Sequence, residues 1–363
     1  MRKRSKNDIL TALFPPRRRT SGVPGREKER SVAVKVLVLS HQGRYERFAP
    51  RTSAAYRAAE LVFCGREESE EAWLAAGADA DALFVTPVTW VRESLMARMP
   101  NLKLIHSEGV GFDRIDLDAA ARRGIYVCNN AGCNAEAVAE QAVMMMSLLL
   151  HRTLWGHRMV LDGRQGEAVM TLEGDVPRDL SDVTVGLVGF GAIGQATARR
   201  LRANGSRVVY YARHRRSGET EAACGAEYLP LERLAEECDI VSLHLPATAE
   251  SAGLVNEAFL ARMKPGSFLV NTARGAVVDD AALCAAIRSG QLAGAALDAY
   301  VPEPVPPDHP LVELAKDCPD RVLLCPHQGG LTLSSFRNVY RMLFENLERL
   351  MAGQRPDRVV NGI

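Results

Sequence analysis

The chain alternates short runs of apolar and β-branched residues with stretches that carry the apolar spacing of helices. This alternation predicts parallel strands joined by crossover helices, which is a doubly wound α/β architecture. The runs fall into two sets, and a chain of 363 residues is long enough for two domains. The expected strands are 35–40, 61–64, 82–86, 103–107 and 125–128 in the first set, and 183–188, 208–211, 240–244, 268–272, 294–298 and 322–325 in the second.

One helical pattern, at 134–154, is longer than its neighbours and begins at Asn134, a residue type that caps helices. Shorter patterns lie at 90–99, 117–123 and 195–201, and a final pattern at 336–351 ends before a glycine. The segment 162–182 is polar and contains several glycines, so we expect an irregular connection there.

Charge is distributed unevenly along the chain. Residues 1–30 hold ten Lys or Arg and three Asp or Glu, although the whole chain has a net charge of only +1. The remainder is therefore mildly acidic, and we expect no nucleic-acid partner. We expect residues 1–33 to form a disordered basic leader, because short charged segments bury too little apolar surface to fold. A targeting or polyanion-binding segment is the alternative.

Membrane and metal signals are both weak. The longest apolar run, 142–150, is too short to cross a bilayer, so no membrane association is expected. The eight cysteines form no C-x-x-C pair, and no spacing of ligands suggests a metal site. We expect reduced thiols in a cytoplasmic protein.

A glycine motif, Gly189-x-Gly191-x-x-Gly194, follows the apolar run 183–188 and opens a helical pattern. This context makes it a dinucleotide-binding fingerprint. The first glycine permits a tight turn, the second lets the backbone approach a pyrophosphate, and the third lets helix and strand pack closely. Free amides at the helix N-terminus then face the anion.

The end of the next expected strand bears on the choice of cofactor. An acidic residue there would bind the adenosine ribose, but this chain has Ala212, followed by Arg213-His214-Arg215-Arg216. Guanidinium groups bind phosphates bidentately, so the pattern favours NADP(H), with NAD(H) still possible. The alternative is a basic loop that only contacts solvent.

Three reactive side chains follow three strands of the second set: Arg274, Glu303 and His327. The carboxyl ends of parallel strands form the ligand-binding edge of such a sheet. An Arg can pair with a substrate carboxylate, and a His can pass a proton to a forming alkoxide. A carboxylate bonded to that His favours its charged form and orients the ring. Together they predict reduction of a 2-keto acid.

With these motifs the chain resembles the D-isomer-specific 2-hydroxyacid dehydrogenase family over most of 35–362. The matching segments are Gly-Val-Gly-Phe-Asp at 109–113, Asn-Ala-Glu-Ala-Val-Ala-Glu at 134–140, the glycine motif, His-Leu-Pro at 244–246, Asn-Thr-Ala-Arg-Gly at 271–275, Ala-Leu-Asp at 296–298 with Glu-Pro at 303–304, and Pro-His-Gln-Gly-Gly at 326–330. One departure is Glu108, which directly precedes the first segment and lies near the expected pocket.

The resemblance implies a role for each matching residue. Arg274, Glu303 and His327 match the catalytic trio, and backbone amides of Val110 and Gly111 match those that bind the substrate carboxylate. Asp298 matches the residue that contacts the nicotinamide carboxamide. The expected cofactor contacts are Gly189, Gly191, Ala192, Ile193, Gly194, Arg213, Leu245, Pro246, Thr272, Ala273, Asp298, His327 and Gly329.

The resemblance also implies a domain order. A Rossmann nucleotide domain, 134–326, is expected to be inserted into a flavodoxin-like substrate domain formed by 34–133 and 327–363. It further implies a homodimer that forms through the nucleotide domain.

The expected substrates are small 2-keto and D-2-hydroxy acids, with a glyoxylate or hydroxypyruvate reductase as the leading interpretation. Two alternatives remain. One is an enzyme similar to D-3-phosphoglycerate dehydrogenase, although the segment 86–89 lacks the Arg that such enzymes carry there. The other is a non-catalytic NAD(H)-sensing corepressor built on the same scaffold.

Overall fold

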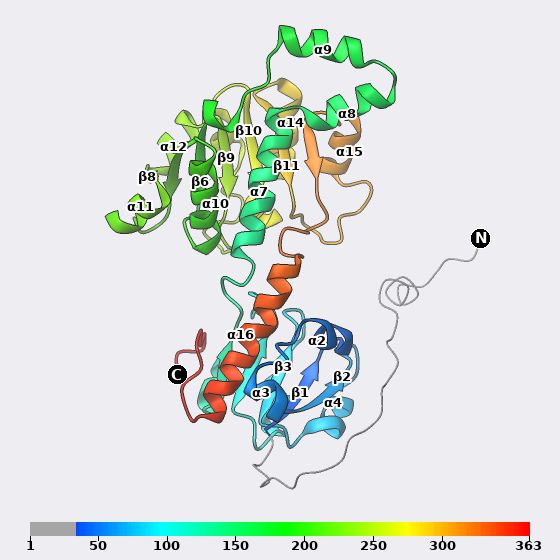
Figure 1. Ribbon diagram of the computed structural model, residues 1–363, viewed down its shortest axis with the longest axis vertical. Helices are drawn as coiled ribbons and strands as arrows, with labels where there is room; N and C mark the ends of the chain where they lie inside the picture. Colours follow the sequence, from blue (N-terminus) through cyan, green and yellow to red (C-terminus); the bar gives the residue numbers. More distant parts are fainter. Residues whose placement is uncertain (1–33) are drawn as a thin grey trace, which may run out of the picture. The chain divides into compact units, whose positions relative to one another are not determined.

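The computed structural model describes residues 34–363. The predicted leader, 1–33, lies outside the described residues. The described part contains two sheets, of five and seven strands, and every strand pair in both is parallel. The prediction of a doubly wound α/β fold is therefore confirmed (Figure 1).

The first sheet has the order β2-β1-β3-β4-β5, which is the flavodoxin-like order. Its strands are β1 (Lys35–Leu39), β2 (Glu60–Cys64), β3 (Ala82–Val85), β4 (Leu104–Ser107) and β5 (Tyr126–Cys128). The helices between them are α2 (Gln42–Phe48), α3 (Ala54–Ala58), α4 (Glu70–Gly77), α5 (Glu93–Ala97) and α6 (Leu117–Arg122).

The C-terminal helix α16 (Leu333–Met351) packs on this first sheet. Its buried Tyr340, Leu343 and Phe344 share a hydrophobic cluster with Val36 and Phe84 of the strands. Segments from the two ends of the described chain thus form one core. This packing supports the predicted domain bounds, 34–133 with 327–363 and 134–326, which stay a prediction.

The second sheet has the order β12-β11-β10-β9-β6-β7-β8. Its strands are β6 (Thr184–Val188), β7 (Arg207–Tyr211), β8 (Ala226–Tyr228), β9 (Ile240–Leu243), β10 (Ser267–Asn271), β11 (Leu292–Leu297) and β12 (Val322–Leu324). Its helices and 3-10 turns are α7 (Ala135–Leu150), α10 (Ala192–Ala203), α11 (Gly218–Cys224), α12 (Leu231–Glu237), α13 (Glu257–Arg262), α14 (Asp280–Ser289), α15 (Pro310–Asp317), η1 (Leu180–Asp182) and η2 (Gly275–Val277). Chain order reverses at β6, which pairs with both β7 and β9.

The predicted long helix 134–154 ends earlier than its apolar pattern. Helix α7 ends at Leu150, and Arg152 has a positive φ of 50°, which redirects the chain into α8 (Thr153–Leu161). The irregular connection expected at 162–182 is also wrong in part, because α9 (Gln165–Gly174) lies within it. Helix α9 packs against α8, away from the seven-stranded sheet (Figure 1). A helix in this position does not need the strong apolar stripe of a helix that covers a sheet, and the sequence of α9 has none.

Two further properties concern the described residues as a whole. Within 34–363, no helix combines the length and apolar content that crossing a bilayer requires. The same residues bring no three His, Cys, Asp or Glu side chains close enough to hold a metal ion.

Candidate active site

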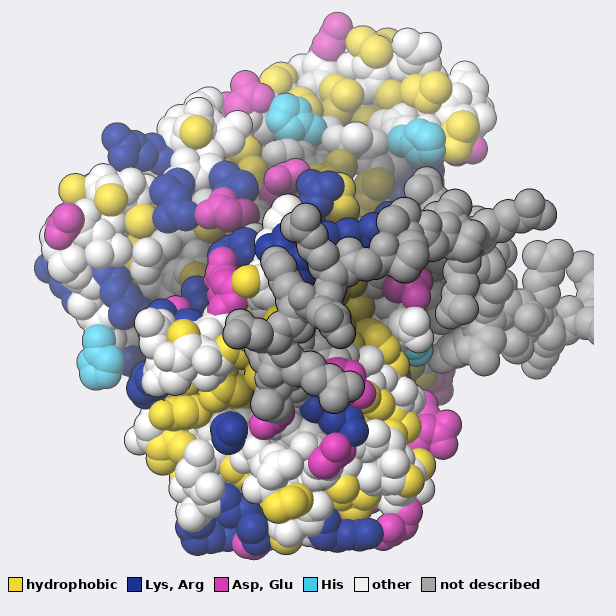
Figure 2. Space-filling model, turned by 60° about the horizontal axis from the view of Figure 1, so that its bottom comes forward, with side chains coloured by type: hydrophobic (Ala, Val, Ile, Leu, Met, Phe, Trp, Pro, Cys, Tyr) yellow, Lys and Arg dark blue, Asp and Glu magenta, His cyan; other side chains and the backbone are white. Residues whose placement is uncertain are grey.

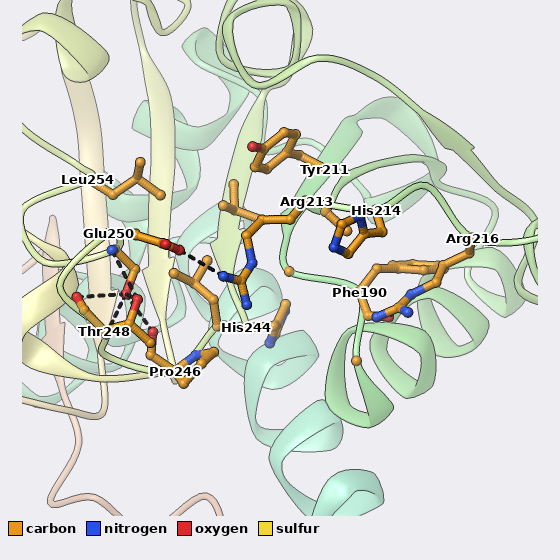
Figure 3. A pocket seen from close by; sticks show the side chains of 16 residues that line it. Phe190, Tyr211, Arg213, His214, Arg216, His244, Pro246, Thr248, Glu250 and Leu254 are labelled. Carbon is orange, nitrogen blue, oxygen red and sulfur yellow. Dashed lines mark hydrogen bonds and ion pairs between the residues drawn. The ribbon is translucent and has the colours of Figure 1, made fainter.

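A cavity of about 520 Å³ lies at the point where the order of the second sheet reverses. Its walls come from the carboxyl ends of β6, β7 and β9 and the turns that follow them (Figure 3). Such a switch point is where open α/β sheets bind nucleotides. The lining residues are Val188, Gly189, Phe190, Gly191, Tyr211, Ala212, Arg213, His214, Arg216, His244, Leu245, Pro246, Thr248, Glu250, Ser251 and Leu254.

The three motif glycines meet different surroundings. Gly189 has a φ of +102°, and a Cβ there would lie 2.4 Å from the carbonyl oxygen of His244. A Cβ on Gly194 would lie 2.3 Å from the carbonyl oxygen of Gly189, so helix and turn could not pack as they do. A Cβ on Gly191 would meet open space. The turn itself therefore requires Gly189 and Gly194, whereas Gly191 keeps free the space into which a pyrophosphate fits.

The basic run after β7 divides between the cavity and the exterior. Arg215 makes two hydrogen bonds to Glu221, at 2.8 and 2.9 Å, and this pairing lowers the pKa of Glu221 to about 2. Arg213 and Arg216 line the cavity. Arg216 donates from Nε to the carbonyl oxygen of Phe190 over 3.1 Å, and Arg213 pairs with Glu250 over 2.7 Å.

His244 also borders the cavity, but it contributes no positive charge. Burial lowers the pKa of His244 to about 4, so its ring is neutral at physiological pH. Its Nε2 lies 3.0 Å from the hydroxyl of Ser242. The guanidinium groups of Arg213 and Arg216 are therefore the strong cations at this end of the cavity.

His327 and Glu303 lie together after the strands β12 and β11. Nδ1 of His327 is 2.7 Å from one carboxylate oxygen of Glu303 and 3.0 Å from the other. The amide of Tyr300 also donates to Glu303, over 2.9 Å, which fixes the carboxylate relative to its own loop. The two side chains are 47% and 36% exposed, so a small molecule can reach the pair.

Buried Asp298 holds the loop that carries His327. Its two carboxylate oxygens accept the amides of Gln328 and Gly329, at 2.9 and 2.8 Å. A Cβ on Gly329 would lie 3.0 Å from Asp298, which explains a glycine at that position. His327 itself has a positive φ of 55°, a strained conformation for a residue with a side chain. Such strain persists where surrounding contacts hold it, and it concentrates at functional sites.

Arg274 follows β10, but the structure does not pair it with the other two members of the predicted trio. Its Nη1 donates to the carbonyl oxygen of Ala273 over 2.7 Å, and the side chain is exposed. Nearby, the hydroxyl of Thr272 is buried with no hydrogen-bond partner among the described residues. A buried donor without a partner is rare and fits a site that a ligand completes.

In the first sheet, the predicted substrate loop at 109–111 follows β4. Its three carbonyl oxygens are all tied back: Gly109 accepts the amide of Asn130, Val110 accepts the side chain of Asn129, and Gly111 accepts the hydroxyl of Ser107. The amides of Val110 and Gly111 donate no hydrogen bond to another described residue. They are thus available to an anion.

Several residues that shape these sites were missed from the sequence. Asn129 and Asn130 directly follow β5, and polar residues after a strand were a usable signal for them. Phe190 and Glu250 carried no such signal, because each acts through an arginine distant in sequence. Ser107 was missed although its partner, Gly111, is only four residues away. Eight of the predicted cofactor contacts lie outside the cavity lining and stay predictions: Ala192, Ile193, Gly194, Thr272, Ala273, Asp298, His327 and Gly329.

Glu108 is buried beside the substrate loop. Its carboxyl oxygens accept the hydroxyl of Ser40, over 2.8 Å, and that of Tyr45, over 2.6 Å. Burial raises the pKa of Glu108 above its usual value. The folded state therefore binds this proton more tightly than the unfolded state.

A Glu108→Gln variant tests this linkage. In the wild type, the contribution of Glu108 to the free energy of unfolding falls as pH rises from its unfolded-state pKa through its raised folded-state pKa. Gln does not ionise, so the Tm of the variant relative to wild type should increase from pH 5 to pH 8. Thermal unfolding at both pH values measures this, with exposed Glu60→Gln as the control. A Tm difference independent of pH would contradict the assignment.

Comparison with known proteins places this architecture in a family. Residues 143–329 match the family model described as D-isomer specific 2-hydroxyacid dehydrogenase, NAD binding domain. A glyoxylate reductase of Thermofilum pendens is 37% identical over 283 residues, which are 78% of this chain and 82% of that protein. A D-3-phosphoglycerate dehydrogenase of Mycobacterium bovis is 35% identical over 87% of this chain and 58% of its own length.

Solved structures agree with the sequence relatives. The D-lactate dehydrogenase of Lactobacillus jensenii, crystallised with NAD⁺, superimposes with a TM-score of 0.78 at 26% identity, over 90% of this chain and 99% of that one. The chain belongs to the D-isomer specific 2-hydroxyacid dehydrogenase family. It is therefore a nicotinamide-dependent oxidoreductase of 2-hydroxy and 2-keto acids, as the sequence predicted.

Proposed function

We propose that this enzyme reduces a small 2-keto acid of the glyoxylate or hydroxypyruvate kind to a D-2-hydroxy acid, with His327, Glu303 and Arg274 at the reacting carbon. The observation that carries the proposal is the 2.7 Å contact between His327 Nδ1 and Glu303 on adjacent strand ends. The glyoxylate reductases among its relatives support the substrate class.

His327 is the proposed proton donor. Because Nδ1 is engaged with Glu303, Nε2 is the nitrogen left to hold a proton for the substrate oxygen. Glu303 keeps the ring oriented, and Asp298 supports the loop from behind. When bound, the nicotinamide cofactor supplies the hydride.

The substrate carboxylate is proposed to bind the free amides of Val110 and Gly111 and the guanidinium of Arg274. Arginine is suited to this, since its planar fork matches a carboxylate. Ser107, Asn129 and Asn130 fix the amides of the loop in place by holding its carbonyl groups. Pre-formed donors of this kind lose little entropy on binding.

We propose NADP(H) as the preferred cofactor. Arg213 and Arg216 border the cavity, and Ala212 stands where an acidic residue would repel a 2′-phosphate. The open space over Gly191 and the unpartnered hydroxyl of Thr272 fit a bound dinucleotide.

Turnover with a panel of keto acids tests this function. We expect oxidation of NADPH with glyoxylate and hydroxypyruvate, and lower kcat/KM with NADH. The panel should include 3-phosphohydroxypyruvate, because a phosphoglycerate dehydrogenase is also among the relatives. Preference for the phosphorylated acid would replace the proposed substrate class. No turnover with any 2-keto acid, by folded protein that binds cofactor, would refute the proposal.

We also propose a homodimer that forms through α8 and α9. Exposed apolar side chains on these helices are Leu154, Val160, Leu161, Val169 and Met170. Helices α8 and α9 lie beyond one end of the seven-stranded sheet (Figure 1), and hydrophobic side chains gather at the top of the space-filling view (Figure 2). Leu161 and Met170 are 71% and 68% exposed, and contiguous apolar surface of this kind marks a protein interface. A second copy of the chain is the proposed occupant, because the interface in the resembling family lies in the nucleotide half.

A charged substitution on this face should separate the subunits. Leu161→Asp with Met170→Asp is expected to shift the protein from dimer to monomer in light scattering at micromolar concentration, since charges at an apolar interface remain unpaired. Met351→Lys, at a 40% exposed position at the end of α16, is the control. A wild-type monomer would contradict the proposal.

For location we propose the cytoplasm. All eight cysteines are free thiols, and six of them are buried in hydrophobic clusters: Cys128, Cys133, Cys224, Cys238, Cys284 and Cys325. Reduced thiols are typical of a reducing compartment.

A further inference from the structure

Glu250 lies on the side of the cofactor cavity opposite to Arg213, and the two side chains extend toward each other (Figure 3). Arg213 follows β7, and Glu250 lies in the turn after β9. These two strands flank β6 in the sheet, and the motif glycines follow β6. The ion pair, at 2.7 Å, therefore bridges the two walls of the cavity beside the turn where a dinucleotide binds.

The backbone of the Glu250 turn is held firmly by its neighbours. The hydroxyl of Ser251 donates to the carbonyl oxygen of Pro246 over 2.7 Å and accepts the amide of Thr248 over 2.8 Å. The amide of Gly253 donates to the carbonyl oxygen of Ala276. The turn therefore holds the backbone of Glu250 in place at the cavity wall.

The pair itself is easily exchanged. Its side chains are 71% and 72% exposed, and exposed ion pairs contribute little to stability. A phosphate is a stronger partner for a guanidinium than a carboxylate, because it carries more charge and more acceptor oxygens. A 2′-phosphate that reached Arg213 would therefore displace Glu250, whereas a free 2′-hydroxyl would not.

From this geometry we infer that Glu250 is a specificity-determining residue that opposes the 2′-phosphate of NADP(H). It competes with the phosphate for Arg213, and once displaced it remains a negative charge near the phosphate. Arg216 stands apart from this competition, because its Nε is bonded to Phe190. This inference rests on the proposed preference for NADP(H). Glu250 weakens that preference and is not its source.

The other ionisable groups near the cavity do not interfere with the proposed competition for Arg213. Glu221 is engaged by Arg215 and by the hydroxyl of Tyr210, so it does not compete for Arg213. His244 is neutral, as its lowered pKa indicates. Among the described residues that line the cavity, Glu250 alone carries a carboxylate.

The test is a binding experiment without turnover. The probes are 2′,5′-ADP, which carries the 2′-phosphate, and ADP, which lacks it. In a Glu250→Gln variant, calorimetry should show about three- to tenfold tighter binding of 2′,5′-ADP and little change for ADP. The gain should shrink in 0.5 M salt, where charges this exposed are screened.

Two controls isolate the proposed competition. Glu232→Gln removes the same charge from an exposed position on α12, outside the cavity, and should leave both affinities unchanged. Arg213→Gln should weaken binding of 2′,5′-ADP and remove most of the gain caused by Glu250→Gln, as a double-mutant cycle measures.

Three outcomes are decisive. Tighter binding of 2′,5′-ADP with unchanged binding of ADP in Glu250→Gln supports the inference, even if the wild type prefers NAD(H) and the proposed cofactor preference fails. Weaker binding of ADP in the variant would assign Glu250 to the ribose hydroxyl groups and overturn the inference. Unchanged affinity for both probes would overturn it as well.

Discussion

A His327→Asn variant is expected to lose about 10²- to 10⁴-fold in kcat, the usual contribution of a positioned general acid. Asn keeps a polar side chain near Glu303 but cannot deliver a proton. Affinity for NADPH should change little, because the cavity that binds the adenosine end is formed by other strand ends. This split between catalysis and binding distinguishes a proton donor from a residue that only supports the fold.

Steady-state kinetics and fluorescence titration of NADPH together measure this prediction. His157→Asn is a matched control, because His157 is an exposed residue of α8 away from the strand ends. An equal loss of turnover and of cofactor affinity in His327→Asn would contradict the assigned role. So would activity close to that of the wild type.

Two glycine variants should separate folding from cofactor binding. Gly189→Ala places a Cβ 2.4 Å from a backbone oxygen at a φ of +102°, so we expect a loss of about 2–4 kcal/mol in the free energy of unfolding. Gly191→Ala places its Cβ in open space at a φ of −79°, so stability should change by less than about 1 kcal/mol. Its affinity for cofactor should nevertheless fall about tenfold or more, because the methyl group occupies the approach to the pyrophosphate.

Thermal unfolding without ligand and titration with NADPH give the two readouts for each variant. The expected pattern is a low Tm for Gly189→Ala, and a wild-type Tm with weak binding for Gly191→Ala. Wild-type cofactor affinity in Gly191→Ala would show that the space over this glycine is not where the cofactor lies.

Much of the fold could be predicted because strand patterns and turn glycines are local signals. The strands on either side of Gly189 begin and end within one or two residues of their predicted bounds. The break after Leu150 was missed, since the apolar pattern continues through Leu154 while Arg152 turns the chain. Helix α9 was missed because it packs against α8 and so needs no strong apolar stripe.

The candidate site was predictable to a lesser extent. Residues after strands could be identified, because parallel strands bring their carboxyl ends to one edge. The partners of these residues could not be identified. The pairs Arg213–Glu250 and Val110–Asn129 join segments that lie apart in sequence and come together only in the folded chain. The same holds for Asp298, whose contacts with the loop after His327 depend on the register of β11 and β12.

The most direct test of the central claim is the configuration of the product formed from hydroxypyruvate with NADPH. Chiral chromatography of the reaction mixture should find D-glycerate with wild-type enzyme, and almost none with His327→Asn at the same enzyme concentration and time. L-glycerate, or D-glycerate formed at similar rates by both proteins, would contradict the site built from His327, Glu303 and Arg274.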